Sequence, residues 1–185
     1  MYNNTYDIIN IQLLAGDTLT YSIRLANTTD IPDMCHLMHE AFSIYSDPPS
    51  SALDETISSI TNNRQQGEQA GLLFDNTNTL LAMIRFVQTD KTISFHRFAV
   101  KPSIQGKGLG SLLLTWLEDY AVHQDVLTLT CKVRKNLSQN ISFYEKNGYQ
   151  QDNNWTPSIQ HSTPVLAFTK SITTTNKKKT RIASY

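Results

Sequence analysis

The sequence predicts an α+β fold in which a central mixed sheet of about seven strands is covered by about four helices. Apolar runs with strand and helix periodicity follow one another in the order β-α-α-β-β-β-α-β-α-β-β. A glycine-rich segment at residues 105–110 stands where a predicted strand gives way to a predicted helix. Neither an internal repeat nor a linker interrupts residues 1–172, so we expect one domain there.

Composition and charge exclude several classes of protein. The 185 residues are 39% hydrophobic and 17% charged, which is ordinary for a globular chain with a core of its own. The net charge of zero gives no general attraction to nucleic acid or to a membrane, so neither is expected as a partner. No apolar run approaches about 18 residues and no signal-peptide pattern opens the chain, so the expected location is the cytoplasm.

The two cysteines, Cys35 and Cys131, lie far apart and lack the spacing of a metal site or a disulfide framework. We therefore expect no bound metal. Cys131 falls in a β-type run, and we expect a reduced core residue there rather than a nucleophile.

The part of the chain before the glycine segment supplies the first strands and two helices. Residues 1–19 form an N-terminal arm, in which residues 8–14 are either a short extra strand or a loose segment. Capping side chains at residues 27–30 and Pro32 in the first turn predict the start of a helix. The predicted elements are strands at 21–26, 72–74, 80–87 and 92–100, and helices at 31–42 and 53–65.

After the glycine segment the chain returns to the sheet. Gly148 stands in a helix-ending position. The predicted elements are helices at 109–123 and 137–147, a buried strand at 126–133, and a hairpin of strands at 149–155 and 165–172. Residues 173–185 are rich in threonine and lysine and predict a flexible, basic and polar tail. A solvated end is favoured over a nucleic-acid contact for this tail.

The three glycines of residues 105–110 predict a site for a phosphate. Glycine lets the backbone approach a ligand closely, and the first N–H groups of a helix have no partner inside it. The spacing excludes two other phosphate loops. No glycine stands four residues before a Gly-Lys-Ser/Thr, and Ser111 replaces the third glycine of a dinucleotide fingerprint.

Three motifs together resemble the GNAT family of N-acetyltransferases over residues 21–172. The first is Gln105-x-x-Gly108-x-Gly110, which is similar to the family's acyl-CoA loop. The others are Arg97-Phe98-Ala99-Val100-Lys101-Pro102 before it and Tyr144-Glu145-Lys146-Asn147-Gly148-Tyr149 after it. The resemblance implies a mostly antiparallel GNAT-type sheet and acetyl transfer from acetyl-CoA to a primary amine of a small molecule, an amino acid or a protein.

The resemblance also implies which residues bind the cofactor. The diphosphate is expected on the backbone of the loop, with charge added by Lys107. An asparagine is expected to contact the pantetheine arm, and either Asn136 or Asn140 fills that role, because Leu137 holds the usual position. The full set is Phe98, Ala99, Val100, Gln105, Gly106, Lys107, Gly108, Leu109, Gly110, Ser111, Asn136, Asn140 and Phe143.

Acetyl transfer to an amine calls for a base, an acid and a donor to the carbonyl oxygen. For the base we expect His96, which under strict alternation shares a face with Phe98 and Val100; the alternative is a hydrogen-bonded core histidine. Glu55 is a further candidate base. The backbone N–H of Phe98 or Val100 is expected to stabilise the oxyanion. Tyr144 matches the family tyrosine that protonates the leaving thiolate; the alternative is a packing residue.

Two classes of function compete at this stage. The first is an N-acetyltransferase that acts in a ternary complex, and the second is a non-catalytic acyl-CoA-binding module of the same fold. Residues 41–66 are expected to set acceptor specificity, and their carboxylates, Asp47, Asp54 and Glu55, would suit a cationic acceptor. The sequence leaves the oligomeric state open, with a homodimer as one alternative because dimers are frequent in the family.

Overall fold

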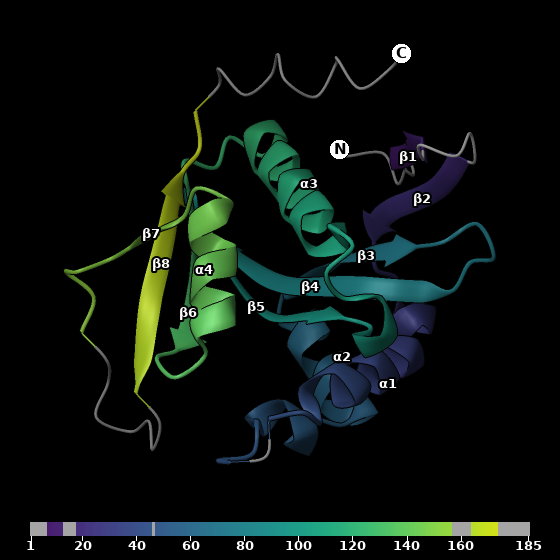
Figure 1. Ribbon diagram of the computed structural model, residues 1–185, viewed down its shortest axis with the longest axis horizontal. Helices are drawn as coiled ribbons and strands as arrows, with labels where there is room; N and C mark the ends of the chain where they lie inside the picture. The colour runs from purple at the N-terminus through teal and green to yellow at the C-terminus, as the bar shows by residue number, and fades with distance from the viewer. Residues whose placement is uncertain (1–6, 13–17, 46, 157–163, 174–185) are drawn as a thin grey trace. The chain divides into compact units, whose positions relative to one another are not determined.

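A computed structural model describes residues 7–12, 18–45, 47–156 and 164–173 (Figure 1). The chain divides into two compact units. The first holds the residues up to Phe86 together with Arg97–Leu113, and the second holds Val87–His96 and the residues from Leu114 onward. The expected single domain over residues 1–172 stays a prediction, and the expected tail lies outside the described residues from position 174 onward.

The strands of the first unit pair antiparallel in the order β1-β2-β3-β4. Their bounds are β1 (Asp7–Gln12), β2 (Thr18–Leu25), β3 (Gln69–Phe74) and β4 (Leu80–Thr89). β1 decides the alternative for the N-terminal arm, because residues 7–12 form an extra strand along β2. β3 and most of β4 are buried on consecutive residues, which is typical of strands covered on both faces.

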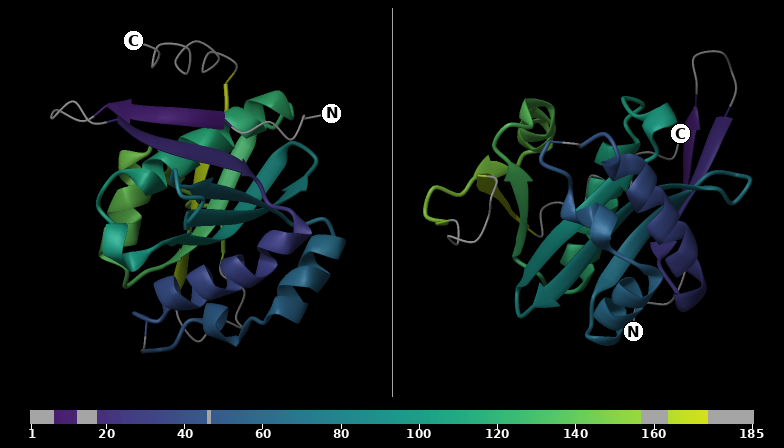
Figure 2. Two further views of the ribbon diagram at one scale, coloured as in Figure 1. Left: turned by 90° about the vertical axis from the view of Figure 1, so that its right-hand side faces the viewer. Right: turned by 90° about the horizontal axis from the view of Figure 1, so that it is seen from below.

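Two helices of the first unit, α1 (Ile31–Phe42) and α2 (Ile57–Gln65), pack side by side against the sheet (Figures 1 and 2). Short 3-10 turns precede them, η1 (Thr28–Asp30) and η2 (Ser51–Asp54). The apolar faces of both helices share one core with β3, β4 and β5. Its members include Met34, Leu37, Met38, Ala52, Ile60, Leu72, Phe74, Met83 and Ala99.

The second helix begins later than residue 53, where the sequence predicted it. Thr56 is extended. Its Oγ1 accepts a hydrogen bond from the Ser59 N–H, and its own N–H donates one to the Ser59 Oγ in return, so this capping box sets the helix start at Ile57. Leu53 therefore belongs to η2, and Glu55 lies in the link between the two elements.

The second unit contains strands in the order β5-β6-β8-β7. Their bounds are β5 (Thr92–Val100), β6 (Thr128–Arg134), β7 (Gln150–Gln151) and β8 (Val165–Ser171). β5 and β6 run parallel, whereas β8 pairs antiparallel with both β6 and β7. β7 is shorter than the strand expected at 149–155, because an Asx turn at Asp152 redirects the chain.

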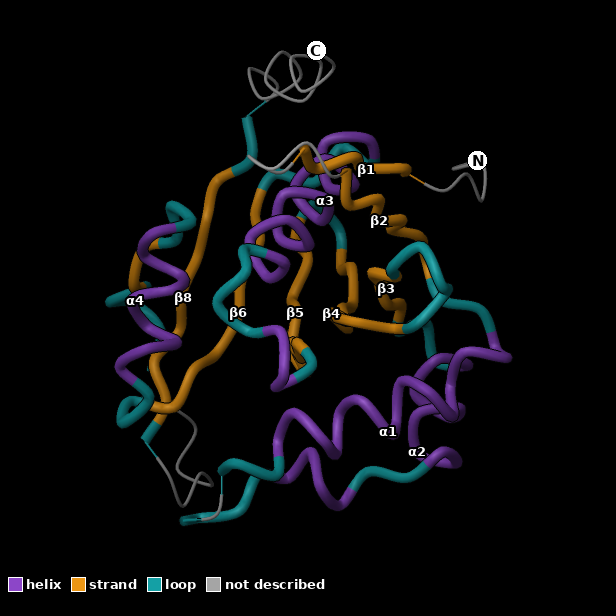
Figure 3. Tube along the Cα trace, turned by 45° about the vertical axis from the view of Figure 1, so that its right-hand side comes forward, coloured by secondary structure: helices purple, strands orange, loops and turns teal. Residues whose placement is uncertain are grey.

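The remaining helices are α3 (Leu109–His123), which continues from the first unit into the second, and α4 (Ser138–Lys146). α4 lies beside β6 and β8 (Figures 1 and 3). The predicted fold class, a mixed and mostly antiparallel sheet with four flanking α-helices, is confirmed; β1 is the strand beyond the expected seven. None of the helices in the described ranges is both long and apolar enough to cross a membrane.

Candidate functional site

The glycine segment makes a sharp turn between a short 3-10 turn, η3 (Pro102–Ile104), and the start of α3. Gly106 and Gly108 have φ angles of +79° and +82°. Residues with a Cβ adopt this left-handed region only with strain, so the turn requires glycine at both positions. A Cβ built at either glycine meets no atom within 4 Å, which leaves room for a ligand to approach the backbone.

Hydrogen bonds close the loop from both sides. The Gln105 Nε2 donates to the carbonyl of Val100 at 3.1 Å, as expected for the residue that begins the motif. On the helix side, the Leu112 N–H donates to the Gly108 carbonyl at 3.0 Å. The amides of Leu109 and Gly110 come before that bond, at the positive end of the helix dipole. The exposed loop thus has the form of an anion site.

The strand before this loop is irregular at Arg97. Its φ of +48° lies in the left-handed region, which is uncommon for a residue with a side chain. The strict alternation expected from His96 through Phe98 to Val100 is therefore wrong, because a left-handed residue interrupts the pleat. Irregular residues within a strand are frequent beside functional sites, where they redirect a side chain.

His96 lies at the end of the parallel ladder of the second unit. The pairing of β5 with β6 runs from Thr92 opposite Thr128 to Phe95 opposite Cys131. His96 is the next residue along β5, and its side chain is exposed. The alternative of a core histidine is therefore wrong. An exposed imidazole can accept a proton from a bound amine and release it to water.

Four charged residues of the first unit form what we call the charged cluster: Glu55, Glu68, Arg85 and Arg97. Arg85 is fully buried, and its Nε donates to Glu68 Oε2 at 2.7 Å. The Arg85 Nη2 lies 2.6 Å from the same oxygen, as an ion-pair contact without hydrogen-bond geometry. The Arg85 Nη1 donates to one oxygen of Glu55, and the Arg97 Nε donates to the other at 2.5 Å.

Glu55 is held from its backbone as well as from its carboxylate. The His39 Nε2 lies 2.8 Å from the Glu55 carbonyl oxygen. Burial opposes ionisation of this carboxyl, but the hydrogen bonds and charges of Arg85 and Arg97 outweigh it and hold the pKa below its usual value. A carboxylate that is so firmly ionised and so fully paired is poorly suited to take a proton from an amine. Among the candidate bases, the geometry favours His96.

Sequence reasoning gave no role to Arg85, Glu68 or Arg97. One signal was available, because Arg85 stands in the otherwise apolar run Leu80–Phe86, and a buried charge requires partners. Those partners, Glu68 and Glu55, lie 17 and 30 residues away along the chain, and no local pattern reveals them.

Tyr144 lies in what we call the aromatic cluster of the second unit: Phe95, Tyr144, Tyr149 and Phe168. The centroid of the Tyr144 ring lies 6.0 Å from that of Phe95, 5.9 Å from that of Tyr149 and 6.1 Å from that of Phe168. Its side chain is buried, at 8% exposure. The ring therefore packs in the core, and the hydroxyl is what distinguishes an acid from a packing residue at this position.

The polar atoms around this cluster are kept protonated by burial. Burial raises the pKa of the Cys131 thiol to about 12, and a hydrogen bond with Tyr144 offsets only part of this. Cys131 is thus a reduced core residue, as predicted, and it is a thiol at neutral pH. Burial also raises the pKa of Tyr149, whose hydroxyl has no hydrogen-bond partner among the described residues.

The end of α4 fixes the position of Tyr144. Gly148 has a φ of +82°. The Tyr149 N–H donates to the Tyr144 carbonyl at 3.0 Å, and the Gly148 N–H donates to the Glu145 backbone carbonyl at 2.9 Å. These two bonds make a Schellman motif, which confirms Gly148 as the residue that ends the helix. The motif ties the backbone of Tyr144 to the following strand.

The two candidate asparagines differ in their placement. Asn136 is exposed in the loop before α4, whereas Asn140 is half-buried in its first turn. Asn140 precedes Tyr144 by four residues, so both lie on one face of the helix. Phe143 is half-buried, with its ring centroid 5.3 Å from that of Tyr144.

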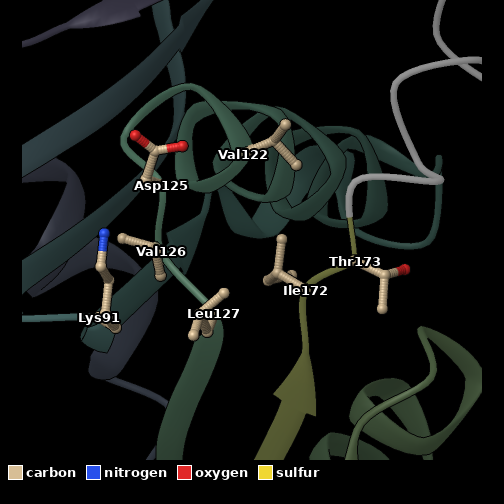
Figure 4. Close-up of a pocket in the computed structure, with 7 residues that line it drawn as sticks. All are labelled: Lys91, Val122, Asp125, Val126, Leu127, Ile172 and Thr173. Carbon is tan, nitrogen blue, oxygen red and sulfur yellow. The ribbon is translucent and has the colours of Figure 1, made fainter.

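A separate pocket of about 470 Å³ lies in the second unit and does not coincide with these residues (Figure 4). Its walls are mostly apolar, and its charged side chains are Lys91 and Asp125. None of the predicted site residues lines it. The remaining residues of its wall are Val122, Val126, Leu127, Ile172 and Thr173.

Comparisons with known proteins agree with this geometry. The sequence matches the acetyltransferase (GNAT) family over residues 31–149, more than half of the chain. Similar solved structures include the ribosomal-protein-S18-alanine N-acetyltransferase of Escherichia coli, with a TM-score of 0.68 and 22% identity over 83% of this chain and 94% of that one.

Two further similar structures contain coenzyme A. The PaiA N-acetyltransferase of Thermoplasma acidophilum has a TM-score of 0.69 and 21% identity over 82% of this chain and 98% of that one. The spermidine N-acetyltransferase of Vibrio cholerae, which also holds spermine, has a TM-score of 0.64 and 14% identity over 82% and 95%. At these identities the similar structures establish the fold.

Proposed function

Because the chain belongs to the GNAT family of acetyltransferases, we propose that it transfers an acetyl group from acetyl-CoA to a primary amine by direct attack in a ternary complex. Family membership makes it an N-acetyltransferase with acetyl-CoA as the acetyl donor. The observation that carries the proposal is the loop at residues 105–110. Two glycines there have left-handed backbone angles, and a hydrogen bond from the Gln105 side chain to the Val100 carbonyl closes the loop. The loop thereby presents backbone N–H groups at the start of a helix.

The cofactor assignments follow from that loop. In this proposal the diphosphate binds the amides of residues 106–110, Ser111 follows in the first helical turn, and Lys107 adds a positive charge. Residues 98–100 hold the acyl-pantetheine arm, and the N–H of Phe98 or Val100 stabilises the charge on the carbonyl oxygen. We favour Asn140 over Asn136 for the arm because Asn140 shares a helix face with Tyr144.

His96 and Tyr144 take the acid–base roles in this proposal. An amine with a pKa of about 10.4 is almost fully protonated at neutral pH, so a base that receives its proton increases the rate. His96 takes that role, since Glu55 is paired with two arginines. Tyr144 donates its phenolic proton to the leaving thiolate. Phenols stay protonated at neutral pH, so the donor is available in every turnover.

The acceptor class is a primary amine. The similar structures include one enzyme named for an alanine of a ribosomal protein and one named for spermidine, so acceptors differ widely on this fold. A cytoplasmic location, a homodimer and the absence of nucleic-acid and membrane partners remain expectations from the sequence.

Thiol release from acetyl-CoA tests this function directly. The purified chain is mixed with acetyl-CoA and a panel of amines, and free thiol is measured with a chromogenic disulfide. We expect amine-dependent release. Tight binding of coenzyme A with no turnover on any amine would instead identify a non-catalytic module.

The loop assignment has its own test in Gly108→Glu. The substitution adds negative charge and backbone strain where N–H groups meet phosphate, so affinity for coenzyme A should fall about 10- to 100-fold by calorimetry. Gly67→Glu is the matched control, because Gly67 also has a left-handed φ (+98°) and no atom within 4 Å of a built Cβ. Unchanged affinity in a folded Gly108→Glu variant contradicts the assignment.

A further inference from the structure

Arg97 carries a guanidinium with donors to spare beside the proposed acyl segment. Its side chain is 23% exposed, so a ligand can reach it while water screens it only in part. The Nε bonds Glu55 at 2.5 Å, and the Nη2 lies 3.3 Å from the Ser51 Oγ. These contacts use two of the five N–H donors of the group. They also orient it, which lowers the entropy lost when it binds a ligand.

Arg97 ends a row of alternating charges that runs through the first unit. Arg24 bonds Asp30 at 2.6 Å, and Asp30 and Glu68 both act on the charge of Arg64. Glu68 contacts Arg85, which shares Glu55 with Arg97. Three guanidinium groups of this row, those of Arg24, Arg85 and Arg97, form ion pairs, and that of Arg97 is the most exposed, at 23% against 11% and 0%.

These ion pairs change the charge that we expect the acceptor to carry. Glu55 was expected to favour a cationic acceptor, but its charge is already shared by Arg85 and Arg97. Asp47 and Asp54 are exposed, where water and salt screen them. Arg97 is thus a paired but accessible cation, and it immediately precedes the segment proposed to hold the acyl group.

We propose that Arg97 binds a carboxylate of the acceptor, so that the preferred acceptors are primary amines that carry a carboxylate, as amino acids do. The inference rests on the proposed acetyl transfer. A guanidinium donates two parallel hydrogen bonds to a carboxylate, which lysine and neutral side chains cannot reproduce. Glu55 and Ser51 act as positioning residues that hold the planar group in place.

Matched acceptors test this role. Initial rates are measured for common amino acids and for their α-amides, which keep the amine and lose the carboxylate charge. Arg97→Gln should lower kcat/KM for the amino acids about 10- to 100-fold, mainly through KM, and change it less than about threefold for the amides. Each variant is compared with wild type on the same acceptor, so differences in amine reactivity cancel.

Three companion variants keep the test decisive. Arg97→Lys should lose less than Arg97→Gln but remain below wild type, because lysine keeps the positive charge and lacks the planar group that donates two parallel hydrogen bonds. Ser51→Ala, at an exposed position, should produce a smaller loss confined to the amino acids, and it serves if Arg97→Gln fails to fold. Lys91→Gln removes a cation in the turn before β5, outside the charged cluster, and should leave the discrimination unchanged.

The outcomes separate this inference from the proposed function. Equal losses on both acceptor sets, or turnover confined to amines without a carboxylate such as a polyamine, overturn the role of Arg97 and leave acetyl transfer intact. Coenzyme A binding with no turnover on any acceptor overturns both. Selective loss on the amino acids supports both.

Discussion

The charged cluster and the surroundings of the aromatic cluster shift the pKa values of ionisable groups in opposite directions. In the charged cluster, Arg85 and Arg97 hold Glu55 ionised despite its burial, and its pKa is lowered. Beside the aromatic cluster, burial dominates for Cys131, which is hydrogen-bonded to Tyr144, and its pKa is raised to about 12. The first region keeps a carboxylate from taking a proton, and the second keeps its proton donors from losing one.

This contrast bears on the chemistry. A general base must be free to accept a proton, and the paired Glu55 is not. A general acid must arrive protonated, and phenols are protonated at neutral pH. In the proposed mechanism the acid therefore comes from the aromatic cluster and the base from outside the charged cluster.

The largest expected effect concerns the base. His96→Ala should lower turnover by about 10²–10⁴-fold, because it removes the group proposed to receive the proton of the amine. Glu55→Gln should lower turnover less, whatever it does to stability. The measurement is kcat for both variants with the same acceptor. If Glu55→Gln loses turnover and His96→Ala keeps it, the charged cluster supplies the base.

Arg85→Ala should break the charged cluster itself. Without this buried cation, Glu55 loses one of its two arginines and Glu68 loses the hydrogen bond of 2.7 Å from Arg85, at a cost of about 3–5 kcal/mol in the free energy of unfolding. Urea unfolding gives this value. Arg85→Met combined with Glu68→Gln should recover part of the loss, because it removes one of the carboxylates that Arg85 balances. A loss below about 1 kcal/mol in Arg85→Ala would show that the remaining contacts of the two carboxylates compensate for Arg85.

Tyr144→Phe tests the aromatic cluster, since it keeps the ring and removes only the proton donor. As general acid, its loss should cut turnover by roughly 10- to 10³-fold, about 1.4–4 kcal/mol, with a smaller change in the KM for acetyl-CoA. The loss of turnover in Tyr144→Phe should be smaller with an acyl donor whose thiol is a better leaving group. Wild-type turnover in a folded variant, measured where chemistry limits the rate, makes Tyr144 a packing residue.

Per unit of pH, the smallest effects are the opposite pH dependences of stability. The folded pKa of Glu55 is lowered, so its contribution is present above its unfolded pKa of about 4.3 and is lost as pH falls through the folded value. The folded pKa of Cys131 is raised from 9.0 to about 12, so its contribution is lost as pH rises above 9, by about 1.4 kcal/mol per unit.

Unfolding in urea across the pH range checks both signs. Glu55→Gln should flatten the acid side alone, and Cys131→Ala should flatten the alkaline side alone. If Glu55→Gln flattened the alkaline side, or Cys131→Ala the acid side, the opposite pKa shifts of these two groups would be wrong.

Local patterns were enough to predict much of this protein. The turn of residues 105–110 before α3 follows from glycine's freedom at positive φ, which depends on neighbours in the sequence. Phosphate binding there stays a prediction. The end of α4 at Gly148 and the capping of the first helix follow in the same way. Periodicity alone predicted the order of the strands and helices and the fold class.

Only the tertiary structure decided which charges meet. The resemblance to the family made Glu55 a candidate base, yet Arg85 and Arg97, 30 and 42 residues away, occupy both of its oxygens. Likewise, the left-handed Arg97 overrode the alternation that placed His96, because strand periodicity assumes a regular pleat. The pKa and the direction of a side chain depend on atoms within a few ångströms, and those atoms come from distant parts of the chain.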